Sequence, residues 1–278
     1  MEQQVEQKIK DGLSQVRPFP HLVKNAIKLI DSGSSDTRDL ADVINKDPIL
    51  SARLLSLANS PFYGMSKKIT EVENACVILG NNIIRNILFS AGAMQCFPVT
   101  EERKKIWSHS IEVATVAQLL AENLNQSPTK AYMAGLLHDV GKFLLLDLFP
   151  EYQVVISSGD SMSYEKSIDK EAGEIGIDHA QAGAKIIEIW NLPEEIRAIV
   201  EKHHSPLDAG DLFSCSLLSL ADEICHKLEK DNSDDDLVKS LKDDVLNVLF
   251  KDKKKIKDML PEIKQKISSL DGMLEQLE

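Results

Sequence analysis

The stretch GLLHDVGKFLLL, residues 135–146, places two ionisable side chains, His138 and Asp139, in an otherwise apolar sequence. Leu137 and Val140 flank the pair, so the sequence predicts a buried helix. Around such a helix the two side chains differ by about 100°, and both can lean toward one point in a groove between helices. Because a buried carboxylate is costly unless a cation or a donor pairs with it, we expect a metal ion at this point.

Two glycines, Gly135 and Gly141, lie on either side of the same pair. A residue without a side chain lets a neighbouring helix or a ligand approach the backbone closely. Helix packing alone explains these glycines equally well, so they do not indicate a site by themselves.

Apolar residues keep helical spacing along almost the whole chain, and no alternating strand of useful length occurs. The first part predicts a helix from Pro18 to about Asp31, a second capped by Asp36, and a third that opens at Asp47-Pro48. Further helices are predicted over roughly 69–80, 81–94, 102–124, 129–147, 179–190, 193–204 and 211–229, with a short helix and loops in the polar segment 150–178. The sequence therefore predicts an all-α fold in two helical halves.

Breaks in this pattern divide the chain into three parts. CFPVTEERKK (96–105) interrupts the apolar spacing, and KDNSDDD (230–236) is a predicted solvated linker. We assign residues 1–100 to an N-terminal helical half, residues 101–229 to a second half that carries the site, and residues 230–278 to a helical C-terminal extension. In the extension we expect one helix around Leu237–Leu249 and another that includes Pro261 near its start.

Composition and charge limit the class of protein. The 278 residues are 43% hydrophobic and 27% charged, with a net charge of −12, which disfavours a nucleic-acid backbone or an anionic membrane as the main partner. The start, MEQQVEQKIKDGLSQV, has no apolar leader segment, and no run of about 18 apolar residues occurs, so we expect a cytoplasmic protein without a membrane span. No CxxC pair occurs among Cys76, Cys96, Cys215 and Cys225, which predicts buried thiols rather than disulfides.

Five of the seven histidines lie between His109 and His204, in or beside apolar helical segments. A single histidine in such a place is usually a hydrogen-bonded core residue, but several together favour a site. His109 shares a helix face with Val113, and Asp222 follows Leu218 by one turn, so both would face the core, although Asp222 alone could be a solvated residue. The candidate metal ligands are His109, His138, Asp139, His179, His203, His204 and Asp222.

Several segments of the chain resemble the HDOD family, a variant of the HD domain used in bacterial signalling. In the second half these are WSHS (107–110), AGLLHDVGK (134–142), DHAQAGAKIIEIWNLPEEI (178–196), HHSP (203–206) and LADEI (220–224). In the first half, INKDPILSARLLSLANSPFYG (44–64) and ITEVENACVILG (69–80) are similar to the N-terminal half of that family. The resemblance covers roughly residues 10–228 and implies an HDOD architecture with an HD-type helical bundle in the second half.

The resemblance also implies roles for the candidate residues. In the HD superfamily of metal-dependent phosphohydrolases, the residues that match His109, His138, Asp139 and Asp222 hold one metal ion, and Asp139 could bridge to a second. In the dinuclear branch, which includes the HD-GYP cyclic di-GMP phosphodiesterases, the residues that match His179, His203 and His204 supply the second ion. Lys142 matches the lysine of an HDxGK motif and would face a substrate phosphate, so Asp139 and Lys142 are the candidate catalytic residues.

Two departures argue against hydrolysis of cyclic di-GMP. The segment HHSPLDAGD (203–211) contains no GYP sequence, and Lys105 stands four residues before His109, where HD-GYP enzymes can carry an acidic ligand. An acidic chain also suits a small phosphorylated substrate poorly unless Lys142, Arg197 or Lys202 raises the local potential.

These observations lead to two main functional hypotheses. The first is a bacterial signal-transduction adaptor with a retained HD-type metal site, and the alternative is a metal-dependent phosphohydrolase that acts on a nucleotide or another phosphoester. A structural or nucleic-acid role is the third. The mixed imidazole and carboxylate ligands suit one or two divalent transition-metal ions, with Fe or Mn ahead of Zn, Co or Ni. The expected partners are a separate signalling protein, a small phosphorylated molecule, or both, and the oligomeric state, including a homodimer, stays open.

Overall fold

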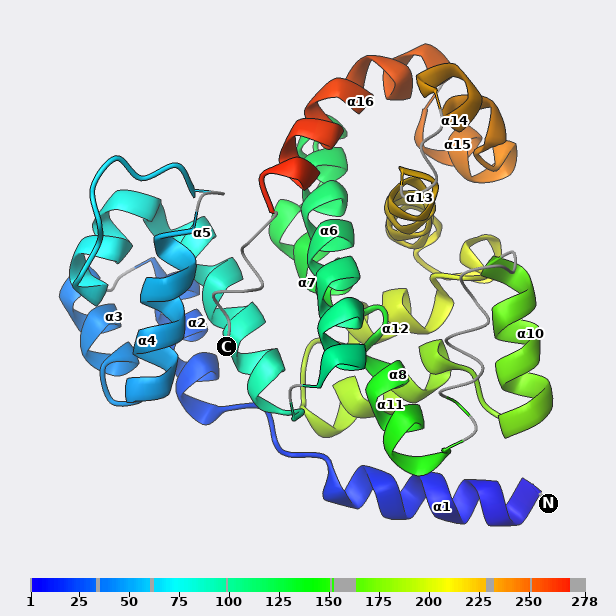
Figure 1. Cartoon of the computed structure of the whole chain (residues 1–278), viewed down its shortest axis with the longest axis horizontal. Helices are drawn as coiled ribbons and strands as arrows, with labels where there is room; N and C mark the ends of the chain where they lie inside the picture. The colour runs from blue at the N-terminus through cyan, green and yellow to red at the C-terminus, as the bar shows by residue number, and fades with distance from the viewer. Residues whose placement is uncertain are drawn as a thin grey trace. The chain divides into compact units, whose positions relative to one another are not determined.

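The computed structural model describes residues 2–33, 36–60, 63–98, 100–150, 152, 164–228, 233–250 and 252–270, without the side chains of residues 2–4 and 164–167. Every regular element in these ranges is a helix, and none is a strand (Figure 1). The all-α prediction is confirmed. Residues 153–163, in the polar segment for which a helix and loops are predicted, lie outside this description.

The elements follow one another as α1 (Glu2–Gln15), α2 (His21–Ser32), α3 (Thr37–Ile44), α4 (Pro48–Ala58), α5 (Val72–Gln95), α6 (Glu101–Asn123), α7 (Pro128–Leu137), α8 (Val140–Leu148), α10 (Tyr164–Ile175), α11 (His179–Ile189), α12 (Glu194–Lys202), the 3₁₀ helix η2 (Pro206–Asp208), α13 (Leu212–Leu228), α14 (Asp234–Ser240), α15 (Asp243–Leu249) and α16 (Lys253–Ser268). Packing divides them between two compact units. Unit 1 comprises Met1–Val16 and Lys105–Leu260, and unit 2 comprises Arg17–Lys104 and Pro261–Glu278.

The borders of these units differ from the three ranges assigned along the sequence. Helix α1 belongs to unit 1, because it packs against α8 and α11 and buries Ile9. Helix α15 packs against α13, so most of the C-terminal extension also belongs to unit 1. The division of the chain into three parts stays a prediction, with the ranges 1–100, 101–229 and 230–278.

In unit 2, helix α5 is the element against which α2, α3 and α4 all pack. Proline starts α4, and Oδ1 of Asp47 accepts hydrogen bonds from the backbone N–H groups of Ile49 and Leu50, at 2.9 and 3.1 Å. Gly80, with a φ of 76°, interrupts α5 at the point where the sequence predicts one helix to end and the next to begin.

Helix α5 is the one described helix with the length and apolar composition of a membrane span. Of its most apolar window, 56% is buried within the fold, as is common for the core helix of a globular protein. All four cysteines are buried free thiols, as the sequence predicts.

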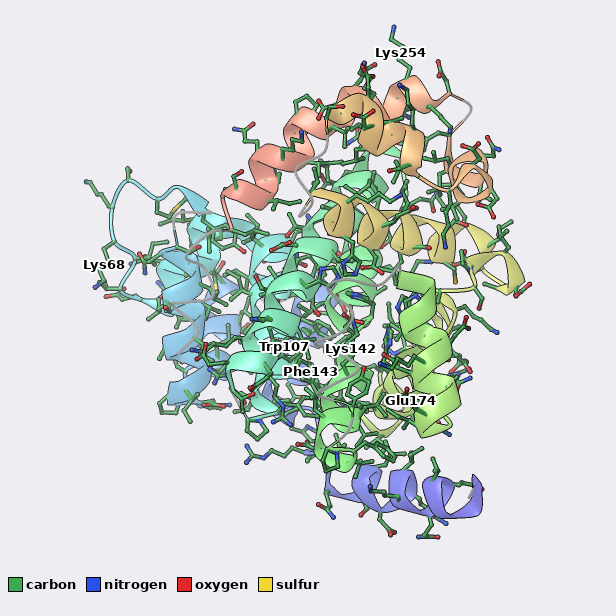
Figure 2. All side chains as sticks on the ribbon, turned by 45° about the vertical axis from the view of Figure 1, so that its right-hand side comes forward. Lys68, Trp107, Lys142, Phe143, Glu174 and Lys254 are labelled. Atoms are coloured by element: carbon green, nitrogen blue, oxygen red, sulfur yellow. The ribbon has the colours of Figure 1, made fainter. Side chains whose placement is uncertain are left out.

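In unit 1, helix α11 packs against both α8 and α12, and α13 packs against α7 and α12. A Cβ atom at Gly141 of α8 would lie 1.9 Å from the carbonyl oxygen of His179, so only glycine permits this approach of α8 to α11. A Cβ atom at Gly135 would lie 2.6 Å from the Cα atom of Ala114 in α6. The rings of Trp107 and Phe143 join α6 to α8, with centroids 4.7 Å apart (Figure 2). Helix packing therefore explains both glycines.

The structure differs from the predicted helices in three places. The helix predicted over 129–147 is broken, because Asp139, with φ and ψ of −99° and 6°, leaves the helical conformation between α7 and α8. The helix expected around Leu237–Leu249 is divided into α14 and α15, because Leu241 is extended. Pro261 lies inside α16 instead of near its start.

Candidate metal centre

The seven predicted ligands come from separate segments of unit 1 and meet at one place. Three of them lie on helices, namely His109 on α6, His179 at the start of α11 and Asp222 on α13, whereas His138 and Asp139 form the junction of α7 and α8, and His203 and His204 follow α12. The close contacts described below connect all of them. Their roles as ligands stay a prediction.

The first group of ligand atoms lies around the carboxylate of Asp222. Its Oδ1 atom lies 2.9 Å from Nε2 of His109 and 3.6 Å from Nε2 of His138. The ligand atoms of these three residues lie within 4.8 Å of one another. Two imidazole nitrogens and a carboxylate oxygen are a ligand set that transition-metal ions accept.

The second group consists of His179, His203 and His204, whose ligand atoms also lie within 4.8 Å of one another. Nε2 of His179 is 2.7 Å from Nε2 of His204, and the ring centroids of His203 and His204 are 3.7 Å apart. Two imidazole nitrogens approach this closely only when a proton or a cation lies between them.

Asp139 lies between the two groups. Its Oδ2 atom is 3.4 Å from Nε2 of His138, and its Oδ1 atom is 3.2 Å from Nε2 of His179. The two oxygens of one carboxylate thus face histidines of different groups, as a bridging ligand would. Asp139 forms a further group within 4.8 Å with His138 and His203, and His109 does not belong to that group.

Backbone carbonyls orient two of the histidines. Nδ1 of His138 donates to the carbonyl oxygen of Gly135 at 2.7 Å, and Nδ1 of His203 donates to that of Val200 at 2.5 Å. Because Nδ1 donates its proton to a carbonyl oxygen, Nε2 is the nitrogen of each ring that can bind a cation when the ring is neutral. Both Nε2 atoms are buried without a hydrogen-bond partner. A divalent cation fits these residues, because it would satisfy Nε2 of His203 and would lie between Nε2 of His138 and the carboxylates beside it.

Burial and neighbouring charges shift the pKa values of the site. Burial disfavours charge on Asp139, but the nearby His138 and Lys142 outweigh it and hold the pKa of this carboxyl well below its usual range. For Asp222, His226 and His138 likewise outweigh burial and lower the pKa. Burial lowers the pKa of His203 to about 3. The site therefore offers ionised carboxylates and a neutral imidazole, which are the protonation states that metal binding requires.

His138 behaves differently from His203. Burial lowers its pKa, but Asp139 and Asp222 outweigh burial and raise the pKa overall. Without a cation, a proton on the ring compensates the two carboxylates. A bound cation would take the place of that proton, so metal binding is expected to release it.

Glu171 of α10 is a residue of this site that the sequence analysis missed. Its buried carboxylate accepts hydrogen bonds from the backbone N and from Nδ1 of His179, at 2.8 and 2.7 Å, and from the hydroxyl of Tyr152 at 2.8 Å. A carboxylate that accepts from Nδ1 fixes the tautomer of a ligand histidine and directs its Nε2 toward the metal. Glu171 lies in a polar segment, and no spacing in the sequence distinguishes it.

His226 is the second residue that the sequence analysis missed. It lies one turn after Asp222 on α13, with Nε2 3.4 Å from Oδ1 of Asp222 and its ring centroid 4.3 Å from that of His109. The separation of four residues from Asp222 is the signal that could have identified it.

Lys142 lies in the site, where it pairs with a predicted ligand. Its Nζ atom is 2.6 Å from Oδ2 of Asp139, so its ammonium group compensates that carboxylate. The predicted contact of Lys142 with a substrate phosphate stays a prediction. Arg197, another cation considered from the sequence, is paired with Glu194 and Glu201 on its own helix.

The HDOD domain family matches residues 16–206 of the chain, which is more than half of its length. The chain belongs to the HDOD family. The matched range includes all of the predicted metal ligands except Asp222, which lies beyond its end on α13.

Two curated relatives of this HDOD chain are much longer proteins. An uncharacterized protein of Treponema pallidum is 27% identical over 205 residues, which cover 71% of this chain and 39% of that protein. Ribonuclease Y of Ureaplasma parvum is 28% identical over 121 residues, which cover 44% of this chain and 20% of the ribonuclease. The HDOD chain therefore spans less than half of the length of either relative.

Solved structures show the same fold. A proposed phosphohydrolase of Shewanella amazonensis matches the HDOD chain with a TM-score of 0.78 at 21% identity, over 98% of both chains. A proposed signal transduction protein of Marinobacter aquaeolei matches with a TM-score of 0.78 at 20% identity, over 99% of this chain and 66% of that one. At these identities the likeness concerns the fold alone.

Proposed function

We propose that this HDOD chain is a metal-binding signal-transduction protein that acts as a regulatory adaptor. The observation that carries the proposal is the meeting of ligand-type side chains around two buried Nε2 atoms, those of His138 and His203. Membership of the HDOD family and the name of the Marinobacter protein, which concerns signal transduction, support the signalling role.

The site would hold one or two divalent transition-metal ions. Fe or Mn is the preferred ion, followed by Zn, Co or Ni, because imidazole together with carboxylate suits these ions better than Mg or Ca. The first ion would bind His109, His138, Asp139 and Asp222, and the second would bind His179, His203 and His204 with Asp139 as the bridge.

Metal occupancy would control the packing of unit 1, because the ligands come from segments that are far apart in the sequence. An ion would tie α6, the junction of α7 and α8, α11, the end of α12, and α13 to one point. The free energy of metal binding then stabilises that arrangement of helices. Two states that differ in occupancy provide a switch that a partner can detect.

A partner protein could contact the segment that joins the two groups of ligands. Leu207 of η2 and Leu212 at the start of α13 are 50% and 39% exposed, although both are large apolar residues. They lie between His204 and Asp222 in the chain, and η2 packs against α13. A change in the position of α13 would therefore alter an apolar surface of the kind that binds other proteins.

A second candidate function is a metal-dependent phosphohydrolase, which Lys142 and the name of the Shewanella protein favour. Bound ions would supply an activated water and would polarise a phosphate. The side chains of His109, Lys142 and His226 are 11%, 18% and 35% exposed, so a phosphate would approach from this edge of the site. Lys142 would then exchange its contact with Asp139 for one with the phosphate. The net charge of −12 works against RNA as the substrate.

The experiment compares protein loaded with Mn²⁺ or Fe²⁺ with protein treated with EDTA. The adaptor role predicts that loading raises the unfolding temperature, slows hydrogen exchange in α6, α8, α11 and α13, and produces no turnover of nucleotides, cyclic dinucleotides or aryl phosphates. Metal-dependent turnover that Asp139→Asn abolishes, and that the exposed control Asp147→Asn retains, would establish the hydrolase instead. No effect of metal on unfolding or exchange would contradict the proposal.

A further inference from the structure

Three imidazole nitrogens converge on a single oxygen atom, Oδ1 of Asp222. The Nε2 atoms of His109, His226 and His138 lie 2.9, 3.4 and 3.6 Å from it. A carboxylate oxygen has about two lone-pair sites, so it cannot accept a well-directed hydrogen bond from three rings at once. A cation held by Asp222 would therefore have the three Nε2 atoms close to it.

The position of His226 on α13 suits a ligand. Residues four apart on a helix lie on the same face, one turn along, and two ligands at this spacing bind one metal ion in helical zinc motifs. Asp222 and His226 have this spacing, and Nε2 of His226 faces the same Oδ1 atom of Asp222 that Nε2 of His109 approaches. The helix thus presents a carboxylate and an imidazole to the same point.

The surroundings of His226 differ from those of a core histidine. Its side chain is 35% exposed, so it fills little of the apolar core. Its ring lies beside that of His109, with an angle of 31° between the ring planes, so the two rings orient each other with their Nε2 atoms near the same oxygen. A role as ligand explains why this partly exposed ring lies at the edge of the site. There it would separate a bound ion from the solvent.

We propose that His226 is a direct ligand of one bound ion, together with His109, His138 and Asp222. The inference rests on the proposed metal-binding function and makes it more specific. Together with the bridging Asp139, the protein would then supply three imidazoles and two carboxylates to this ion, so few positions would remain for water or a substrate. The first ion would then anchor α6, α13 and the junction of α7 and α8 to one another.

The test uses Co²⁺, which reports its coordination through its visible absorption, with wild type, His226→Gln and His21→Gln. Glutamine at 226 keeps a hydrogen-bond donor for Asp222 but removes the imidazole. His21 is an exposed histidine of α2 in unit 2, so His21→Gln is the matched control. The measurements are the dissociation constant of each bound Co²⁺, from competition with a chelator, and the absorption spectrum of each ion. Circular dichroism and thermal unfolding of the metal-free proteins verify folding.

We expect His226→Gln to raise the dissociation constant of one bound Co²⁺ by more than about 100-fold and to change the absorption spectrum of that ion. A loss of affinity of this size exceeds the loss that is typical of a residue that only supports a ligand. His21→Gln should match the wild type in both measurements. A smaller loss with an unchanged spectrum would show that His226 only donates a hydrogen bond to Asp222, and would overturn the inference while the proposed function stands. Wild-type protein that binds no Co²⁺, Mn²⁺ or Fe²⁺ would overturn both.

Discussion

The Nζ atom of Lys142 lies 2.6 Å from Oδ2 of Asp139, the carboxylate that stands between the two groups of histidines. Burial lowers the pKa of Lys142, but Asp139 and Glu171 outweigh it and raise the pKa overall, so the pair is ionised. A metal ion would compete with this ammonium group for the same oxygen. Lys142 and the metal are therefore alternative partners of Asp139.

Replacing Lys142 by methionine should destabilise the metal-free protein more than the metal-loaded one. The substitution leaves Asp139 buried without its ammonium partner, a change that costs about 3 kcal/mol, whereas a bound ion would compensate the same charge. Urea unfolding with EDTA and with Mn²⁺ measures the two free energies. The exposed Lys185→Met on α11 is the control. An equal loss in both conditions would reject the competition between Lys142 and the metal.

Glu171→Gln should weaken metal binding without removing any ligand. An amide cannot accept both hydrogen bonds from His179 and the one from Tyr152 as an ionised carboxylate does, so the orientation of the His179 ring is less well fixed. The expected loss of metal affinity is about 10-fold to 100-fold. Glu174→Gln, on the exposed side of the same helix, should bind metal like the wild type (Figure 2). Equal affinities for the two variants would show that Glu171 does not support His179.

Gly141→Ala should disturb both the packing of α8 on α11 and the metal site. The added Cβ atom would lie 1.9 Å from the carbonyl oxygen of His179, so one of the two backbones must move. Such crowding typically costs about 1–3 kcal/mol of stability. Gly173→Ala is the control, because no atom lies within 4 Å of the added Cβ in α10. Thermal unfolding measures the difference, and equal unfolding temperatures would contradict the packing described for Gly141.

Lowering the pH should destabilise the metal-free protein, and the loss of stability should begin at pH values well above those at which carboxylates titrate. Burial lowers the pKa of His203 from 6.5 to about 3, and burial together with His203 lowers that of His204. Between about pH 6.5 and pH 3 the unfolded chain therefore binds more protons than the folded one, so the free energy of unfolding falls as the pH falls. The raised pKa of His138 opposes part of this effect.

Urea unfolding of EDTA-treated protein at pH 7.5 and pH 5 measures the acid effect. The wild type should lose more stability between these pH values than His203→Gln, because glutamine does not titrate. If the two proteins lost the same amount, His203 would not be the buried neutral imidazole described here.

Much of the site could be predicted from the sequence, because histidines and aspartates are conspicuous inside apolar helical segments. His109, His138 and Asp222 were identified in this way, and the structure brings them together. The break between α7 and α8 could not be predicted, because it depends on the backbone angles of Asp139 and not on a proline or glycine at that position.

Tertiary contacts explain what the sequence analysis missed. Glu171 is buried only because Tyr152 and His179 surround its carboxylate, and a polar segment gives no sign of such partners. Helix α1 is absent from the predicted helices, and nothing in its sequence identifies α8 and α11 as its neighbours. His226 had the required spacing from Asp222, but the ring of His109, far away in the sequence, is what places it at the site.

The metal content of protein purified without chelator tests the central claim most directly. Inductively coupled plasma mass spectrometry would compare the wild type with Asp139→Asn, which removes the proposed bridging charge, and with the exposed Asp147→Asn on α8. We predict about one or two equivalents of a divalent transition metal in the wild type and in Asp147→Asn, and a clear loss in Asp139→Asn. A wild-type protein that holds no metal even after incubation with Fe²⁺ or Mn²⁺ would contradict the account.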